Sequence, residues 1–544
     1  MSKKLLMGNE AIAFGALRAG VSVVTGYPGT PSSEILDTVA KNNDGSVYVE
    51  WSVNEKAALE VAAGAAYAGA RVLVTMKQVG LNASSDPLMC LNYIGVKGGM
   101  VIVVADDPGP ISSQTEQDTR HFAKYAKLSL FDPSTPEEAY TMIADAFEHS
   151  EKYGQPVLFR PTTRVCHSCA SIDILDDLPK KQAEGFIKDE KWVIFPRLSY
   201  NNHIKIQEDL LKMREDFSNY DKNLLTGSGK KGIAVGGVSY SYTLEALESL
   251  DINHKLLKVT TFPFPDKLAL EFLTGLDEVL VVEELDPVIE EDLVRLCGLH
   301  NLNVKIKGQN TRNTPIAGEF TPESVEAAIC KFFEEEIGES RNLKNTPNSS
   351  FLTPNSKAPP EIPGRAPSLC IGCPHRASFS AVKNATQGIS AVYTGDIGCY
   401  TLGNTLGMVD TCLCMGAGIT IAQGLHRIEP DTVHFAFIGD STFFHSGITG
   451  IVNAVYNQSD IIVVILDNST TAMTGGQPHP GTGVTMMGNV TEKIDIGNVV
   501  EALNITKLFR VDPFKAREAR QAVTDAMALK GVRVIIFESP CIML

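Results

Sequence analysis

The sequence predicts a multi-domain α/β protein built on parallel sheets. A chain of 544 residues is too long for one hydrophobic core, because single cores stop growing at about 250–300 residues. Short apolar runs that end in turn-forming residues, such as VLVTMKQVG, GMVIVVADD and PVLFRPTT, are typical of parallel strands buried on both faces. Helix-forming segments separate these runs, and such alternation is the pattern of βαβ units.

The composition of the chain indicates which partners and which cellular compartment to expect. The formal charge is −16 and no basic run extends beyond pairs such as Lys180-Lys181, so we expect neither nucleic acid nor an anionic membrane as partner. No apolar stretch reaches about 18 residues, and the short basic start is interrupted by Gly8, Asn9 and Glu10, which argues against a signal peptide. The 11 cysteines, odd in number and unevenly spread, favour a reducing compartment over a disulfide framework. We expect the cytoplasm.

Changes in composition divide the chain into five segments. Residues 1–177 form a strand–helix series, in which NEKAALEVAAGAAYAGA carries small apolar residues on every side and predicts a buried helix. Residues 178–230 are polar and Lys-rich and are expected to connect to a middle α/β domain at 231–337. Residues 338–365, rich in Pro, Asn and Ser, predict an extended linker, and residues 366–544 form the last α/β domain.

Gly439-Asp440-Ser441, followed 28 residues after the aspartate by Asn468, is the most specific chemical pattern. Both halves end apolar runs that predict buried strands, HFAFI and DIIVVIL. A carboxylate and an amide at neighbouring strand ends suit Mg²⁺ that itself holds a diphosphate, and the helix after Gly439 offers N–H groups to anionic oxygen. A simple turn with an N-cap is the alternative. With the Gly-rich tail TTAMTGG, the pattern resembles the thiamine-diphosphate motif.

Thiamine diphosphate also needs a carboxylate beside its pyrimidine ring, because this hydrogen bond favours the reactive tautomer of the cofactor. Glu55 is the candidate, since it begins a small-residue helix directly after a predicted strand. A first-turn glutamate that interacts with the helix dipole is the alternative. Glu50 and Glu60 compete for the role.

Four long motifs resemble the alpha subunit of the indolepyruvate:ferredoxin oxidoreductases, a branch of the 2-oxoacid:ferredoxin oxidoreductases: GYPGTPSSEI, EWSVNEKAALEVAAGAAYAGARVLVTMKQVG, GDSTFFHSGI and DNSTTAMTGGQPHPGTG. The resemblance covers nearly the whole chain. It implies a thiamine-diphosphate-enzyme fold, with a pyrimidine-binding domain at 1–177 and a diphosphate- and Mg²⁺-binding domain at 366–544. It also implies oxidative decarboxylation of an arylpyruvate, such as indolepyruvate, to an aryl-acetyl-CoA, with CoA as co-substrate and ferredoxin or a similar carrier as electron acceptor.

The resemblance assigns roles to the cofactor-binding residues. Asp440 and Asn468 would bind Mg²⁺, with the backbone carbonyl near Thr470 as a third ligand, and Glu55 would activate the pyrimidine. The remaining residues expected to bind the cofactor are Gly439, Ser441 and Gly398.

Further residues are candidates for binding the substrate or moving protons. Thr30, in GYPGTP, would hydrogen-bond the substrate carboxylate or carbonyl. Arg120, in SSQTEQDTRHFA, is a charge partner for the 2-oxoacid carboxylate, which a guanidinium can bind through two hydrogen bonds; a solvated loop arginine is the alternative. His375 and His479 lie in motifs near the site and could transfer protons or serve as structural hydrogen-bonding groups.

Four cysteines have the order that holds a 4Fe–4S cluster in the wider family: Cys370, Cys373, Cys399 and Cys541. Four thiolates at one locus suit iron–sulfur ligation. Cys412 and Cys414 compete for the third or fourth place, while a zinc site and plain burial as small apolar residues are the alternatives. Cys166-His167-Ser168-Cys169 lacks a partner pair, and we interpret it as structural.

Alpha subunits of this family usually continue into a cysteine-rich, ferredoxin-like segment, whereas this sequence stops at FESPCIML. We therefore expect either a separate ferredoxin-like subunit or a changed redox partner, together with a smaller beta subunit and a dimer of alpha subunits. A non-oxidative thiamine-diphosphate-dependent 2-oxoacid decarboxylase or carboligase is the alternative activity. A cofactor-binding subunit without catalysis is disfavoured, because both Glu55 and Asp440 are present.

Overall fold

The computed structural model describes residues 2–52, 54–185, 191, 196–248, 250, 252–334, 368–410, 412, 415, 416, 418, 419, 422, 423, 426, 431–456 and 458–544. The chain divides into two compact units, Met1–Glu50 with Glu55–Lys357 and Trp51–Asn54 with Ala358–Leu544, and each is described by itself. The predicted linker at 338–365 lies outside the described residues. Within the described ranges, no helix combines the length and apolar character needed to cross a bilayer.

The first unit contains a seven-stranded sheet with the strand order β12–β6–β7–β5–β4–β2–β3. Its strands are β2 (Val23–Gly26), β3 (Tyr48–Trp51), β4 (Val72–Lys77), β5 (Met100–Ala105), β6 (Ser129–Phe131), β7 (Val157–Phe159) and β12 (Thr261–Phe262). The β2–β4, β4–β5, β5–β7 and β6–β7 pairs are parallel, and β12 is antiparallel to β6. The central strands β4 and β5 are almost wholly buried, which confirms the predicted parallel-sheet class.

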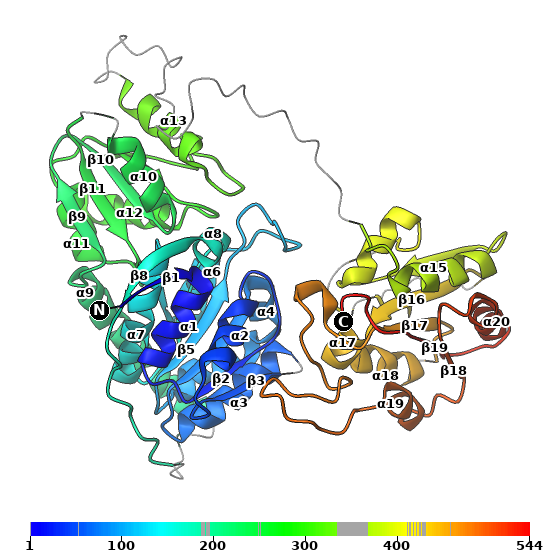
Figure 1. Ribbon diagram of the computed structural model, residues 1–544. Helices are drawn as coiled ribbons and strands as arrows, with labels where there is room; N and C mark the ends of the chain where they lie inside the picture. Colours follow the sequence, from blue (N-terminus) through cyan, green and yellow to red (C-terminus); the bar gives the residue numbers. More distant parts are fainter. Residues whose placement is uncertain are drawn as a thin grey trace. The chain divides into compact units, whose positions relative to one another are not determined.

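Helices cover this sheet, and Figure 1 shows α1, α2 and α3 near its strands. They are α1 (Gly8–Arg18), α2 (Ser33–Asn42), α3 (Glu55–Tyr67), α4 (Gln78–Ala83), α5 (Ser85–Ile94), α6 (Thr119–Ala126), α7 (Pro136–Tyr153) and α8 (Thr163–His167). The short strands β1 (Ser2–Met7) and β8 (Cys169–Ile174) pair antiparallel. Helix α3 buries Ala58, Ala62 and Ala66 completely, as its run of small residues predicts.

A second sheet of the same unit has the order β14–β13–β10–β11–β9. Its strands are β9 (Leu224–Gly227), β10 (Lys231–Gly236), β11 (Lys255–Val259), β13 (Glu278–Val282) and β14 (Lys305–Lys307). All pairs are parallel except β9 with β11. The helices of this region are α9 (Pro196–Ser218), α10 (Ser239–Glu248), α11 (Asp266–Leu273), α12 (Val288–His300) and α13 (Pro322–Phe332).

The stretch at 178–230, predicted as a polar connection, contains helix α9 and the edge strand β9. Helix α9 buries Ile206, Met213 and Phe217, which lie seven and then four residues apart on one face. The other face of the helix is polar and exposed. The overall composition of the segment is therefore polar, and for this reason it did not predict a helix.

The two sheets of the first unit share one apolar cluster, which runs from α3 and the central strands β4 and β5 into β11, α11 and α12. Strand β12 contributes to this continuity, because Phe262 and the following Phe264 lie in the same cluster while β12 pairs with β6. The seven-stranded sheet and the middle sheet are therefore packed as one body.

Buried ion pairs reinforce this junction. Arg120 Nη2 donates to Asp118 Oδ2 at 2.6 Å, and Arg120 Nη1 donates across to Glu283 Oε2, also at 2.6 Å, directly after β13. Arg160 Nε donates to Asp106 Oδ2 at 2.7 Å, and its Nη1 donates to Asp132 Oδ2 at 3.0 Å. Burial raises the pKa of Glu283 to about 7 even though Arg120 opposes this shift.

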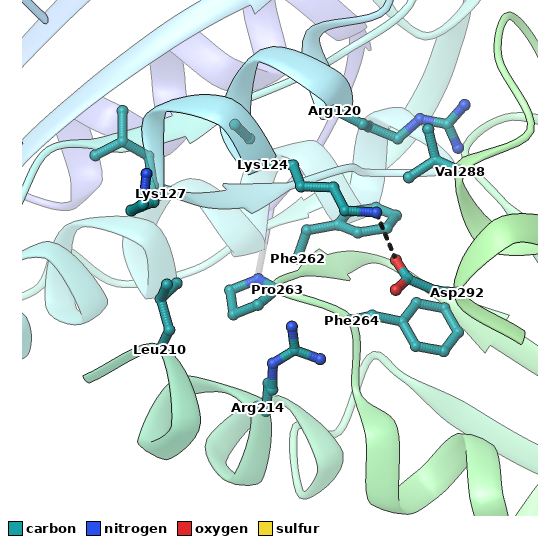
Figure 2. A pocket seen from close by; sticks show the side chains of 12 residues that line it. Arg120, Lys124, Lys127, Leu210, Arg214, Phe262, Pro263, Phe264, Val288 and Asp292 are labelled. Carbon is teal, nitrogen blue, oxygen red and sulfur yellow. Dashed lines mark ion pairs between the residues drawn. The ribbon is translucent and has the colours of Figure 1, made fainter. Parts of the chain in front are cut away.

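A cavity of about 90 Å³ lies beside Arg120, between α6, α9, β12 and α12. Figure 2 shows its Phe262–Phe264 segment and, on its rim, Lys124 paired with Asp292 at 4.0 Å. In the same view the Arg120 guanidinium lies beside Val288 at the edge of the group.

The second unit carries a five-stranded, wholly parallel sheet in the order β15–β16–β17–β19–β18, and Figure 1 shows β16, β17, β19 and β18 side by side. Its strands are β15 (Ala391–Thr394), β16 (Val433–Gly439), β17 (Ile462–Asp467), β18 (Leu508–Val511) and β19 (Arg533–Glu538). The helical elements are α15 (Pro374–Ala385), η2 (Cys399–Leu406), α17 (Asp440–Thr442), the π-helix η3 (Phe443–Gly447), α18 (Ile448–Tyr456), η4 (Ala472–Thr474), α19 (Ile496–Ala502) and α20 (Ala516–Met527).

Replacing Arg120 by Met should destabilise the first unit by about 3–5 kcal/mol, because Glu283 would remain buried without its cation and Asp118 would keep only the 4.0 Å contact with Arg160. Denaturant unfolding followed by circular dichroism measures the change. Lys124→Met, on the same helix, is the matched control and should cost less than about 1 kcal/mol, since its ion pair is long and half-exposed. Equal effects of the two substitutions would contradict a special role of the buried pairs.

Candidate functional site

Polar residues of the first unit gather where β2, β4 and β5 end. Lys77 is the last residue of β4, the turn at Thr30 follows β2, and Asp107 follows β5. Ser112 connects all three: its carbonyl accepts a hydrogen bond from Lys77 Nζ at 3.1 Å, its hydroxyl donates to the Thr30 carbonyl at 3.0 Å, and its N–H donates to Asp107 Oδ2 at 2.8 Å. Parallel pairing places these strand ends at one edge of the sheet.

Glu55 is the first residue of α3 and is only 6% exposed. Its carboxylate lies against Gly80 of α4: a Cβ at Gly80 would stand 2.6 Å from Glu55 Cγ and 2.7 Å from Oε1. Of the two competing glutamates, Glu50 accepts a hydrogen bond from the Tyr48 hydroxyl at 2.7 Å, and nothing is described for the side chain of Glu60. Glu55 also attracts the Lys77 ammonium electrostatically, so the two side chains belong to one group.

Sequence reasoning missed Lys77. Burial lowers the pKa of its ammonium, because removal from water disfavours the charged form, while Asp107 and Glu55 oppose the shift. In the sequence Lys77 is a single cation at the end of the apolar run VLVTM, and such an isolated lysine does not by itself indicate a site.

Arg120 is placed differently from its predicted role. Each of its three guanidinium nitrogens donates to a protein oxygen, and these belong to Asp118, Glu283 and the carbonyls of Glu284 and Asp286. The guanidinium is buried and neutralised by two carboxylates. This pairing contradicts the prediction that Arg120 binds the carboxylate of a substrate.

In the second unit, β16 and β17 run parallel and place Asp440 and Asn468 at neighbouring strand ends. Asp440 Oδ2 accepts a hydrogen bond from the Asn468 N–H at 3.2 Å, and its Oδ1 accepts from the Ser441 N–H at 2.8 Å. Asn468 Oδ1 accepts from the Thr470 N–H at 3.2 Å. The predicted adjacency of Asp440 and Asn468 is confirmed.

Two histidines contact this pair. His479 Nδ1 accepts a hydrogen bond from the Gly481 N–H at 3.1 Å, so Nε2 carries the proton and donates to Asp440 Oδ2 at 3.0 Å. His375 Nε2 lies 3.4 Å from Asn468 Nδ2. Burial lowers the pKa of His375 to about 4, so its imidazole is neutral at physiological pH.

The residues at this edge fit a magnesium–diphosphate group. Carboxylate, amide and backbone carbonyl oxygens are available from Asp440, Asn468 and Thr470, and this is the donor set that Mg²⁺ prefers. Gly439 accommodates the buried Tyr400 ring beside Asp440, because a Cβ there would lie 2.8 Å from Tyr400 Cε1. The expected cofactor residue Gly398 caps η2, where its N–H donates to Thr401 Oγ1 at 3.1 Å.

The cysteines of the second unit gather near one another: Cys370, Cys373, Cys399 and Cys541. Cys373 and Cys399 pack in one apolar cluster, and Ile542, beside Cys541, reaches Gly372 closely enough that a Cβ there would lie 2.7 Å from its Cδ1. Burial raises the pKa of Cys399 to about 11, and the neighbouring thiols of Cys373, Cys541 and Cys370 add to this shift.

The donor chemistry of these four thiols fits an iron–sulfur cluster. Over the part of the chain that is described, no three His, Cys, Asp or Glu side chains form a closed metal site, so the thiols share a region without completing a coordination shell. Of the competitors, Cys412 is exposed and Cys414 lies outside the described residues. Cys166 is buried and Cys169 exposed, in separate elements.

Two family models match the chain. Residues 14–222 match "Pyruvate flavodoxin/ferredoxin oxidoreductase, thiamine diP-bdg", and residues 396–537 match "Thiamine pyrophosphate enzyme, C-terminal TPP binding domain". The first range contains Thr30, Glu55 and Lys77, and the second contains Asp440 and Asn468.

Curated relatives match over almost the full length. The indolepyruvate oxidoreductase subunit IorA of Pyrococcus horikoshii is 41% identical, over 99% of this chain and 86% of that protein. The subunit of the same name from Archaeoglobus fulgidus is 40% identical, over 100% of this chain and 87% of the relative. A solved 2-oxoglutarate:ferredoxin oxidoreductase from Magnetococcus marinus is 18% identical over 62% of this chain and 65% of its own, with a TM-score of 0.48.

Proposed function

Because the chain belongs to the indolepyruvate oxidoreductase branch of the 2-oxoacid:ferredoxin oxidoreductases, as a thiamine-diphosphate-binding subunit, we propose that its substrate is an arylpyruvate such as indolepyruvate. The proposed products are CO₂ and an aryl-acetyl-CoA, with CoA as co-substrate and electrons passed to ferredoxin or a similar carrier. The observation that carries this proposal is the identity of about 40% to relatives named indolepyruvate oxidoreductase over the whole chain.

Thiamine diphosphate, when bound, supplies the electron sink that lets a 2-oxoacid lose its carboxylate as CO₂. Asp440, Asn468 and the carbonyl of Thr470 hold the Mg²⁺ that neutralises the diphosphate. The backbone at Gly439 and the hydroxyl and N–H of Ser441 would contact the phosphate oxygens. These roles are supported by the oxygen donors gathered at the ends of β16 and β17.

Glu55 and Thr30 serve the reacting end of the cofactor and the substrate. The Glu55 carboxyl group would share a proton with a nitrogen of the pyrimidine ring, as the donor when it is protonated and as the acceptor when the ring nitrogen carries the proton. Thr30 binds an oxygen of the 2-oxoacid. The burial of Glu55, seated against Gly80, supports this role, because a carboxylate held in one position needs no reorganisation during the reaction.

The four gathered cysteines, from Cys370 to Cys541, would hold a 4Fe–4S cluster, which supplies one-electron transfer when bound. His375 stays neutral between this region and Asn468, where it can accept or donate a hydrogen bond. His479 orients Asp440 through its Nε2–H.

We propose a smaller beta subunit, a ferredoxin-like electron carrier and a second alpha subunit as partners, in the cytoplasm. The relatives are themselves named as subunits, which supports an assembly of different chains. The odd number of cysteines, 11 in the chain, supports a reducing compartment.

The test is an anaerobic purification of the chain together with its partner subunit, followed by visible and EPR spectra before and after indolepyruvate and CoA. A broad absorption near 400 nm, with a reduced-cluster signal that requires both substrates, is the expected result. A colourless protein that binds thiamine diphosphate and releases an aldehyde without an electron acceptor would instead establish a non-oxidative decarboxylase.

Glu55→Gln should lower turnover by at least about 100-fold, because the amide cannot hold the proton that the carboxylate holds. Thiamine diphosphate affinity, measured by calorimetry, should change little, since other residues, Asp440 and Asn468, are proposed to hold the Mg²⁺ and the diphosphate. Glu50→Gln is the matched control on the preceding strand and should keep turnover near that of the wild type. Loss of turnover in the control alone would transfer the role to Glu50.

Gly80→Ala should reduce turnover at least about tenfold while the chain stays folded. The added methyl group would meet the flexible end of Glu55 rather than backbone, so the carboxylate moves and the helix remains. Gly64→Ala, on the open face of α3, is the control and should stabilise the helix slightly without affecting turnover. Unfolding of Gly80→Ala at the growth temperature would show that the site cannot adjust in this way.

A further inference from the structure

We propose that the Lys77 ammonium binds the carboxylate of the 2-oxoacid substrate. This inference deepens the proposed function and rests on it. Lys77 lies at the end of β4, on the same sheet edge as the Thr30 turn and within electrostatic range of Glu55. It takes the place that the sequence had assigned to Arg120.

The Lys77 side chain packs against the turn that follows β2. A Cβ at Gly29 would lie 3.0 Å from Lys77 Cδ and 3.1 Å from its Cγ, so the aliphatic stem lies on the residue that precedes Thr30. Ser112 then joins the ammonium to the same turn, because its carbonyl accepts from Lys77 Nζ and its hydroxyl donates to the Thr30 carbonyl. The ammonium is therefore positioned next to the residue proposed to bind substrate oxygen.

The ammonium retains hydrogen-bonding capacity. It has three N–H donors, and its one hydrogen bond within the described part of the chain goes to the Ser112 carbonyl. The nearby carboxylate of Asp107 is already engaged, since its Oδ2 accepts from the Ser112 N–H and its Oδ1 accepts from the Thr163 hydroxyl. Two donors of a largely buried cation are left for an anionic ligand.

A 2-oxoacid is the anionic substrate of the proposed reaction, and its carboxylate needs a cationic partner in the site. An ammonium–carboxylate contact is stronger in a partly desolvated site than in water. The carboxylate carries its charge already in the bound substrate, so the contact contributes to binding of the ground state and should govern KM more than kcat.

Steady-state kinetics of Lys77→Gln, in the complete enzyme, tests the assignment. KM for the arylpyruvate should rise about 10- to 100-fold, the effect of losing one charged hydrogen bond, with kcat changed far less. KM for the corresponding arylacetaldehyde, which lacks the carboxylate, should stay within about twofold of the wild type. Lys77→Arg should restore part of the affinity for the acid, and Lys41→Gln, an exposed lysine at the end of α2, should behave as the wild type.

Equilibrium binding gives a second measurement that does not require turnover. Calorimetry with 3-(indol-3-yl)propionate, a non-reacting carboxylate of similar length, should show weaker binding to Lys77→Gln, whereas the amide of this acid should bind both proteins alike. Equal losses for acid and aldehyde, or unchanged binding of the propionate, would overturn the assignment. If the wild type turned over no 2-oxoacid, the proposed function would fail, while the comparison of acid with amide would still decide whether Lys77 is a carboxylate-binding group.

Discussion

Parallel strand pairing is the constraint on which both polar groups depend. Neighbouring strands that run in the same direction end at the same edge of the sheet, so residues distant in sequence meet there. Asp440 and Asn468 meet because Gly439 pairs opposite Leu466 in β16 and β17. Lys77 and the Thr30 turn meet because β2 and β4 are neighbours in the larger sheet.

The first unit adds a second constraint, which is the neutralisation of buried charge where its two sheets join. Arg120 and Arg160 lie among the carboxylates of Asp106, Asp118 and Asp132, close to the strand ends of the candidate site. Burial still raises the pKa of Asp106 to about 6, so the cations offset only part of the desolvation cost. Removing one partner would leave an uncompensated charge, and the network therefore fixes one packing of the two sheets.

The fold class and the magnesium-type site could be predicted because their signals are local. Apolar runs mark the strands, and the polar residues directly after β16 and β17 mark the edge where they meet. The partners of Arg120 could not be predicted, since Glu283 lies 163 residues away and belongs to the other sheet. Helix α9 was missed because its buried stripe is narrow, and Lys77 was missed because an isolated lysine has no pattern that separates a site from a surface.

The number of unused donors separates a structural cation from one that binds a ligand. Arg120 donates from all three nitrogens to carboxylates and carbonyls, and the buried Lys258 pairs with Glu138 and lies 4.2 Å from the centre of the Tyr240 ring. Lys77 is held by a single carbonyl. In a chain with a net charge of −16, an anionic substrate is repelled at long range, so its binding depends on a cation fixed inside the site. Within the described residues, the partly buried Lys77 ammonium keeps two donors for such a ligand, whereas a neutralised guanidinium does not.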